Sequence, residues 1–143
     1  MRISEVLHVK GDSVVTIAPE STVRELVALL REHNIGAVVV SVGSGTVSGI
    51  VSERDVVRGL ADGLDILDRT IGDIMTSRVH TAPPNESGDH LMKLMTDNRI
   101  RHVPVVEDGT LHGIVSIGDV VKSRMNELQF ERDQLESYVA GSQ

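Results

Sequence analysis

Two short motifs of serine and aspartate carry the clearest chemical signal in the sequence. Ser52 and Asp55 follow an apolar run, and Ser116 and Asp119 repeat the same spacing after a second such run. A serine with an acid three residues later is typical of a helix N-terminus, where the two residues cap each other. The same helix end suits a phosphate, and its carboxylate could accept both hydroxyls of a ribose. Capping and nucleotide binding are both open at this point.

The elements that position these motifs form an internal repeat of about 64 residues. Residues 49–57 (GIVSERDVV) return as 113–121 (GIVSIGDVV), and 35–40 (IGAVVV) return as 100–105 (IRHVPV). In the first copy, β-branched runs predict strands near 14–17, 37–42 and 47–51, the last two joined by Gly43–Ser44–Gly45. Apolar residues with helical spacing predict a helix after the first strand, and a second helix begins near Glu53.

The second copy follows the same order. Its first strand is expected at 78–81, Asp108–Gly109 predicts a hairpin turn, and its last helix begins near Gly118. A strand, a helix and a returning strand imply a parallel crossover, and the hairpin adds an antiparallel neighbour. The sequence therefore predicts an α/β (α+β) protein of two β-α-β-β-α repeats.

Neither copy of roughly 60 residues could bury a sizeable core alone. We therefore expect the two to pack sheet to sheet around a pseudo-twofold axis. The predicted organisation is a first repeat at 1–62, a linker at 63–70, a second repeat at 71–125, and a C-terminal helical extension with a frayed end at 126–143.

Apolar residues of the C-terminal extension recur at imperfect heptad spacing. The first seam contains Val121, Leu128 and Leu135, and the second contains Met125, Arg132 and Val139. The only aromatic residues of the chain, Phe130 and Tyr138, lie in the same segment. About two and a half heptads, with an arginine in one seam, are too few for a self-standing coiled coil. A helix docked across a dimer partner and a helix packed on its own body are the two possibilities.

Composition narrows the classes of function. The 143 residues include no cysteine, which excludes thiol nucleophiles, thiolate metal sites and disulfides and fits a cytoplasmic protein. A net charge of −7 and only 1% aromatic residues oppose nucleic-acid binding through Lys93, Arg99, Arg101 and His102. The start of the chain does not resemble a secretory signal, and no run approaches the ~18 apolar residues of a membrane span, so we expect no membrane association.

Other chemical signals fail on spacing. The six histidines show no metal-ligand spacing, so no metal is expected. The glycines at 43, 45 and 49 lack the third glycine of a dinucleotide fingerprint and join two strands. Because the chain also lacks a Gly-x-Ser-x-Gly elbow, we predict no catalytic residues.

The tandem repeat, in which each copy closes with Gly-Ile-Val-Ser-x-x-Asp, resembles a pair of CBS domains, the modules first named from cystathionine β-synthase. Ser-Glu-Arg-Asp at 52–55 and Arg-His-Val-Pro-Val at 101–105 make it similar to small stand-alone bacterial CBS-domain proteins. The resemblance covers about residues 3–125. It implies a regulatory module for signal transduction, without enzymatic activity, that binds AMP, ADP, ATP, NAD(H) or S-adenosylmethionine in the clefts between the copies.

What the resemblance implies further is a homodimer, formed through the repeats and also through the C-terminal helix, that signals to an unidentified regulated protein by a change of conformation or oligomeric state. Asp55 and Asp119 would hold ribose hydroxyls, and Ser52 and Ser116 would approach phosphate or ribose. Positions expected to line the adenine are Thr16, Ile35, Gly36, Ala37, His80 and Val103.

Three basic residues are candidate phosphate partners: Arg54, Arg101 and His102. A guanidinium supplies forked donors, and a histidine gains charge near an anion. The alternative is that these residues are ordinary solvated charges. Because the copies differ at these positions, we expect the two sites to differ in affinity.

The sequence bears on two other functions. CBS pairs also occur in inosine monophosphate dehydrogenase, but that chemistry needs a cysteine and a barrel of roughly 250 residues, neither of which this chain has. A ligand-independent dimerisation or interaction module is the serious alternative. It would use the heptad-like segment 119–139 and treat both Ser-x-x-Asp motifs as helix caps only.

Overall fold

The computed structural model describes residues 1–11, 13–43 and 45–141. Its elements in chain order are α1 (Ile3–Lys10), β1 (Thr16–Ile17), α2 (Val23–His33), β2 (Ala37–Val40), β3 (Gly49–Ser52), α3 (Glu53–Leu60), the 3-10 helix η1 (Leu64–Asp68), α4 (Ile71–Ile74), α5 (Gly88–Asn98), β4 (His102–Glu107), β5 (Thr110–Ser116) and α6 (Ile117–Gly141). The predicted α/β class and the C-terminal helix are confirmed. Ser44 of the predicted turn and Ser142–Gln143 of the predicted frayed end lie outside the described residues.

The first repeat builds the predicted mixed sheet. β1 pairs parallel to β2, with Ile17 opposite Val40, and β2 pairs antiparallel to β3. The crossover helix α2 is capped by Thr22, whose hydroxyl accepts a hydrogen bond from the N–H of Glu25 at 3.2 Å. Every residue of β2 is buried, as expected for a strand covered on both faces.

The second repeat has only two full strands. β4 and β5 join through Asp108 and Gly109, whose φ angles of 52° and 75° are the two positive values that a tight hairpin turn requires. The predicted strand at 78–81 is wrong. It is reduced to a single parallel bridge between Ala82 and Val105, the counterpart of Ile17 and Val40 one repeat earlier.

The path of residues 76–82 explains that difference. At one end Thr76 bridges to Ile50 of the first sheet, and at the other Ala82 bridges to Val105 of the second. A segment that crosses from one sheet to the other cannot pair along its length with either. Pro83 follows at once and has no N–H to continue the pairing.

Each hydrophobic core takes residues from outside its own repeat. The first core joins Val23, Leu26, Val38 and Val51 with Ile66 and Ile71, and the second joins Leu91, Met95, Val103 and Val115 with Ile3 and Val6. The N-terminal helix α1 therefore packs on the second repeat, while η1 and α4 pack on the first. The ranges 1–62, 63–70 and 71–125 follow the repeat along the chain. In space, the start of the first range belongs to the second core, and residues 66 and 71 belong to the first.

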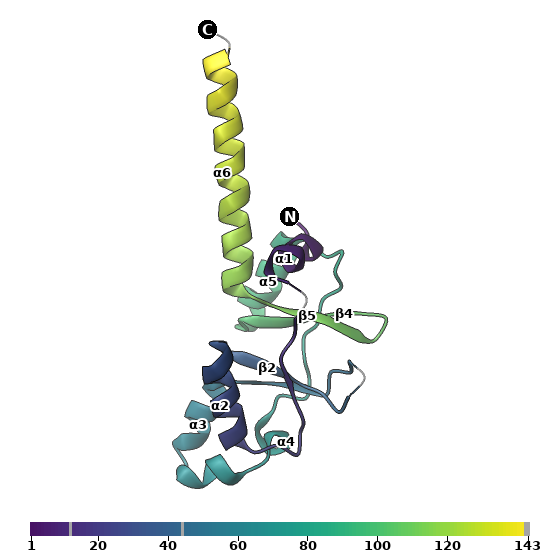
Figure 1. Ribbon diagram of the computed structural model, residues 1–143, viewed down its shortest axis with the longest axis vertical. Helices are drawn as coiled ribbons and strands as arrows, with labels where there is room; N and C mark the ends of the chain where they lie inside the picture. Colours follow the sequence, from purple (N-terminus) through teal and green to yellow (C-terminus); the bar gives the residue numbers. More distant parts are fainter. Residues whose placement is uncertain (12, 44, 142–143) are drawn as a thin grey trace.

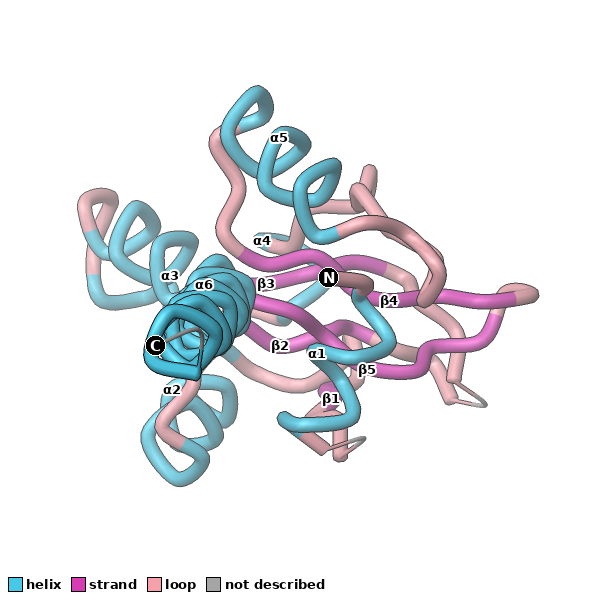
Figure 2. The backbone as a smooth tube through the Cα atoms, turned by 90° about the horizontal axis from the view of Figure 1, so that it is seen from above, coloured by secondary structure: helices cyan, strands magenta, loops and turns pink. Residues whose placement is uncertain are grey.

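The two sheets stack on one another, as predicted. Figure 1 shows β4 and β5 directly above β2, and Figure 2, seen from above, shows the strands of both repeats overlapping at the centre with helices around them. A backbone hydrogen bond of 2.8 Å from the N–H of Leu111 to the carbonyl of Gly45 joins the two hairpin ends. The stacked sheets bring the ends of β3 and β5 to one interface.

Helix α6 extends far beyond the body of the molecule (Figure 1). Val120 is its one buried residue among those described, and its contacts with α1 and α5 lie near its start. Among the described ion pairs, the one between α6 and the body that lies furthest along α6 joins Glu127 to the N-terminal amine of Met1, at 3.5 Å. The possibility of a helix packed along its own body is therefore wrong for most of α6. None of the described helices combines the length and apolar character needed to cross a bilayer.

Candidate functional site

Both Ser-x-x-Asp motifs cap helices in the structure. At the start of α3 the N–H and the hydroxyl of Ser52 both donate to Asp55 Oδ2, at 2.8 and 3.2 Å. At the start of α6 the N–H of Ser116 donates to Asp119 Oδ2 at 2.8 Å, and the N–H of Asp119 donates to Ser116 Oγ at 3.1 Å. Within the described residues, Asp55 Oδ1 receives no hydrogen bond, so this carboxylate caps its helix and keeps one oxygen for a ligand.

Matching backbone bonds tie each motif to the residues that enter the second strand of its repeat. The N–H of Glu53 donates to the Gly36 carbonyl at 3.0 Å, and the N–H of Ile117 donates to the Arg101 carbonyl at 2.8 Å. Gly36 and Arg101 thus occupy equivalent places beside the two helix N-termini. A glycine in one copy and an arginine in the other make the two halves of the site chemically different.

The crossing segment 76–82 closes one side of the site. Ile50 and Thr76 exchange two backbone hydrogen bonds, at 3.0 and 2.9 Å. A Cβ on Gly49 would lie 2.8 Å from the Thr76 carbonyl, so this approach requires glycine. As a result Arg78 and His80, which belong to the second repeat in sequence, lie against the first.

These elements enclose a cleft of about 620 Å³ between the repeats. It is lined from both copies by Gly36, Ala37, Ile50, Ser52, Glu53, Arg54, Asp55, Arg58, Thr76, Arg78, Val79, His80, Arg99, Ile100, Arg101, His102, Ser116, Ile117 and Gly118. A volume in the range of roughly 300–1,000 Å³ is typical of small-molecule sites. The cleft is therefore large enough for a nucleotide.

Most of the residues predicted from the sequence meet in this cleft: Ser52, Arg54, Asp55, Gly36, Ala37, His80, Arg101, His102 and Ser116. Four do not line it. Val103 is fully buried in the second core and Ile35 packs against the first. Thr16 lies on β1, and Asp119 lies beyond Ser116 at the other helix N-terminus.

Asp119 has a charged partner from α1, and no ion pair among the described residues gives Asp55 one. Lys10 Nζ, from α1, lies 2.7 Å from Asp119 Oδ2 and donates also to the Ile114 carbonyl at 2.7 Å. Burial raises the pKa of Asp119, but the hydrogen bonds from Lys10 and Ser116 outweigh it, and the pKa falls below its ordinary value. The second carboxylate is therefore ionised and already paired.

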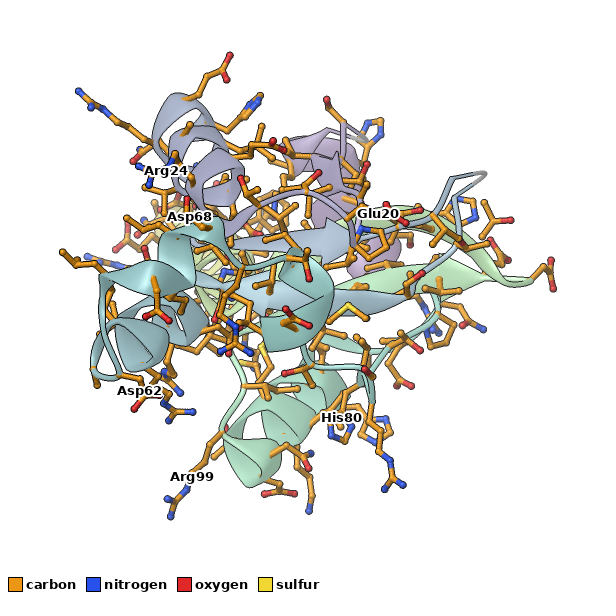
Figure 3. The ribbon with its side chains drawn as sticks, turned by 90° about the horizontal axis from the view of Figure 1, so that it is seen from below. Glu20, Arg24, Asp62, Asp68, His80 and Arg99 are labelled. Carbon is orange, nitrogen blue, oxygen red and sulfur yellow. The ribbon has the colours of Figure 1, made fainter. Side chains whose placement is uncertain are left out.

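Positive charge gathers around the cleft. Five guanidinium groups, of Arg54, Arg58, Arg78, Arg99 and Arg101, face two carboxylates, of Glu53 and Asp55, which leaves a local charge of +3 on a chain of net charge −7. All five arginine side chains are exposed at the rim. Figure 3 shows Arg99 extending outward beyond the end of α5. The cleft is thus the place where this acidic protein attracts an anion.

Sequence reasoning missed Arg58, Arg78 and the placement of Arg99 in this cleft. Arg58 follows Arg54 by four residues on one helix, and this i, i+4 spacing was a usable signal. Arg78 depends on the crossing of segment 76–82, and Arg99 on a left-handed turn at the end of α5, where its φ is 54°. Neither of these features is visible in residue spacing.

His102 stands where the two repeats meet. Burial lowers the pKa of His102, and the positive charges of Lys10 and Arg101 lower it further, so the imidazole is neutral at neutral pH. A Cβ added at Gly36 would lie 3.5 Å from His102 Cε1 and 3.3 Å from Glu53 Oε1. Glycine at this position keeps the floor of the cleft open beside the imidazole.

Comparison with known proteins decides the family. The CBS domain family model matches residues 4–62 and 71–126, both copies of the repeat. The chain belongs to the CBS-domain family. The crystal structure of the CBS-domain containing protein ATU1752 from Agrobacterium tumefaciens is similar to this CBS pair, with 44% sequence identity and a TM-score of 0.84, covering 87% of this chain and 99% of that one.

Two further similar CBS pairs were solved with adenosine-type ligands. The CBS domain protein PAE2072 from Pyrobaculum aerophilum, complexed with AMP, shares 31% identity with a TM-score of 0.75, over 83% of this chain and 89% of that one. The CBS domain pair of protein MJ0100, in complex with 5-methylthioadenosine and S-adenosyl-L-methionine, shares 27% identity with a TM-score of 0.79, over 89% of this chain and 98% of that one.

Proposed function

We propose that this CBS pair is a regulatory module that binds a phosphate-bearing adenosine ligand, such as AMP, ADP, ATP or NAD(H), in the cleft between its repeats. The observation that carries the proposal is the combination in one cleft of a half-exposed carboxylate, Asp55, with five arginines. The carboxylate suits the neutral hydroxyls of a ribose, and the guanidinium groups suit phosphate. Similar CBS pairs that bind AMP or S-adenosylmethionine support an adenosine-containing ligand.

Each part of the ligand has a proposed partner. Asp55 Oδ1 accepts from the ribose hydroxyls while Oδ2 keeps its bonds to Ser52. Ala37 and His80, which both line the cleft, flank the adenine, with Gly36 leaving room for it. Arg54, Arg101 and His102 contact phosphate together with Ser116, and Arg58, Arg78 and Arg99 extend this positive rim.

We further propose that the site built around Asp119 is weaker or unused. Lys10 neutralises Asp119 at 2.7 Å, so a ribose would have to compete with an ammonium group for the same carboxylate. The equivalent position beside Asp55 holds no such cation among the described ion pairs. The chain then binds one nucleotide tightly, and Asp119, Thr16 and Val103 have structural roles.

Ligand binding signals by changing the relative orientation of the repeats or of two subunits, because residues from both repeats line the same cleft. The subunits form a homodimer through the repeats. Its proposed contact surface includes apolar side chains of α2 and α3 that are exposed, at Val27 (41%), Val57 (65%) and Leu60 (39%). The module has no catalytic role of its own, and an unidentified protein reads the change.

Thermal unfolding of the nucleotide-stripped protein tests the proposal. A ligand at about 100 times its Kd adds about 2.7 kcal/mol, which raises Tm by about 5–10 °C for a chain of this size. AMP, ADP, ATP, NAD and NADH are expected to give such a shift. Adenosine and S-adenosylmethionine, which carry no phosphate, are expected to give a smaller one. Absence of a shift with every phosphate-bearing ligand would contradict the proposal.

The second candidate function is a ligand-independent dimerisation module. Two observations favour it: both Ser-x-x-Asp motifs have their capping bonds within the protein, and α6 carries exposed apolar residues. It predicts self-association that is the same with and without nucleotide. Calorimetric titration of ATP into the stripped protein separates the two functions, because a ligand-independent module binds no nucleotide.

A further inference from the structure

Helix α6 carries a line of exposed apolar side chains on a face that the body does not cover. Val121, Met125, Leu128 and Leu135 expose 43, 64, 50 and 65% of their surface. Ser123 and Glu127, on the face nearer the body, are only partly exposed. The exposed line follows the heptad spacing and continues past the last contact of α6 with α1 and α5.

The part of α6 that extends beyond the body is short for an isolated helix. Residues 128–141 are exposed along their whole length, and isolated helices of fewer than about 12–15 residues are marginal in water. The capping box of Ser116 and Asp119 and the burial of Val120 start the helix on the body, so the costly nucleation step is already complete. A second helix against the apolar line would stabilise the rest.

The charges on α6 select the direction of that second helix. Residues 121–129 contain two cations, Lys122 and Arg124, and one carboxylate, a net charge of +1. Residues 131–139 contain three carboxylates and Arg132, a net charge of −2. An antiparallel copy places the positive half of each helix beside the negative half of the other.

A parallel copy would be opposed at two positions. The heptad register would set Arg132 against Arg132 of the partner subunit in the seam, and Glu131 beside Glu136 of the partner subunit. The antiparallel register centred on residue 130 instead sets Lys122 beside the partner's Glu136, a pair that occurs twice by symmetry, against a single like-charge pair between the two copies of Glu131. It also sets the apolar Leu128 against the aliphatic stem of the partner's Arg132.

We infer that α6 pairs with the α6 of a second copy of this chain in an antiparallel two-helix seam, in which Met125 lies against Leu135 of the partner subunit. The seam is a contact separate from the homodimer through the repeats proposed above, since it joins a different pair of chains, and it is independent of nucleotide binding. Such a seam is isologous, since each helix gives the same face to the other. The two bodies then lie at opposite ends of the seam.

Disulfide trapping tests both the pairing and its direction, because the chain has no cysteine of its own. Three variants of the full chain are oxidised at low concentration and run on a non-reducing gel: M125C, L135C and the double variant M125C/L135C. In the antiparallel seam the two copies of residue 125 lie about ten residues, or 15 Å, apart along the axis, too far for a disulfide that needs Cα atoms within about 7 Å.

The antiparallel seam is expected to give a covalent dimer for the double variant and for the mixture of the two single variants, and none for either single variant alone. Covalent dimers of the single variants alone would show a parallel seam and overturn the inference. Failure of every variant to cross-link, in protein that is still dimeric by light scattering, would overturn the seam and leave the homodimer through the repeats standing.

The control is N126C/Q134C. These two residues are exposed and, like Met125 and Leu135, are centred on residue 130, but they lie on the side of the helix away from the apolar line. Both positions are on the surface, so folding is expected to be unaffected. Cross-linking of this control as fast as M125C/L135C would show random collision and contradict the seam.

Discussion

Lys10 Nζ lies 2.7 Å from Asp119 Oδ2, although the two residues are 109 positions apart in the chain. The contact exists because α1, at the N-terminus, packs on the second repeat and not on the first. It places a cation on one of the two equivalent carboxylates of the pair and leaves the other, Asp55, open toward the cleft. Two aspartates that are equivalent in the sequence repeat therefore have different surroundings in the structure.

Removing the Lys10 charge is expected to open the second site. In Lys10→Met the Asp119 carboxylate loses its ammonium partner, and isothermal titration with ATP should show the number of nucleotides bound per chain rise from one toward two. Lys93→Met, which removes an exposed lysine 3.9 Å from Asp97, is the control and should stay at one. An unchanged number in Lys10→Met would show that Asp119 is not held back by Lys10.

Loss of an arginine from the rim should weaken ligands in proportion to their phosphate. A charge-assisted hydrogen bond contributes about 1.5–3 kcal/mol, so Arg78→Gln is expected to lower the affinity for ATP by about ten-fold or more. The affinity for adenosine should change little. Arg24→Gln, far from the cleft and paired with Asp68 at 3.4 Å, serves as the matched control. Equal losses for ATP and adenosine would contradict a phosphate role for Arg78.

His102 should make nucleotide binding depend on pH. Its pKa is lowered in the free protein by burial and by the charges of Lys10 and Arg101. A phosphate nearby would raise that pKa again, so binding takes up a proton and tightens as the pH falls from about 7.5 toward 6. Titration of ATP at both pH values should show that the gain in affinity from pH 7.5 to 6 is a few-fold larger in the wild type than in His102→Asn. Identical pH dependence in the two proteins would remove His102 from the site.

The same histidine predicts the direction of a stability change. Its folded pKa lies below the value of about 6.5 of the unfolded chain, so the unfolded state binds the proton first as the pH falls. The free energy of unfolding should therefore decrease with falling pH in the window below about 6.5. Urea denaturation of the ligand-free protein at pH 7.5 and 5.5, compared with His102→Asn, measures this. A larger decrease in the variant would contradict the expected sign.

Exchange of elements between the repeats is testable through Ile71. This residue begins the second repeat in sequence but is fully buried in the core of the first. Ile71→Ala should lower the free energy of unfolding by about 2–5 kcal/mol, because it leaves a cavity. Leu64→Ala, in the same connecting segment but 75% exposed, should cost far less. Similar losses in urea denaturation for the two variants would contradict the packing described.

The fold was predictable where the signal is local. The Asp108–Gly109 turn follows from residues that tolerate positive φ, and the helices follow from apolar spacing and from Thr22 and Ser116 as caps. Contacts between residues far apart in the chain could not be predicted from the sequence pattern. Nothing in the spacing of Ile3 or Ile71 shows that each packs in the core of the other repeat, and the bridge of Ala82 to Val105 replaces a strand that propensity favours.

The candidate site shows the same division. Ser52 and Asp55 could be predicted because the repeat aligns them with Ser116 and Asp119, and His102 because it is a basic residue where the two copies differ. Arg78 reaches the cleft only because residues 76–82 cross between the sheets, and Val103 is fully buried in the second core, outside the lining of the cleft. Sequence repetition thus located the cleft, while the crossing segment added one of its five arginines.

The most direct test of the central claim is calorimetric titration of ATP into nucleotide-stripped protein, for the wild type and Asp55→Asn. The asparagine is isosteric and can still accept the N–H of Ser52, so the cap of α3 is kept while the charge that holds the ribose is lost. We expect saturable binding to the wild type and an affinity about ten-fold or more lower for Asp55→Asn, with equal Tm values of the two free proteins. Equal affinity in both proteins, or no binding to the wild type, would contradict the account.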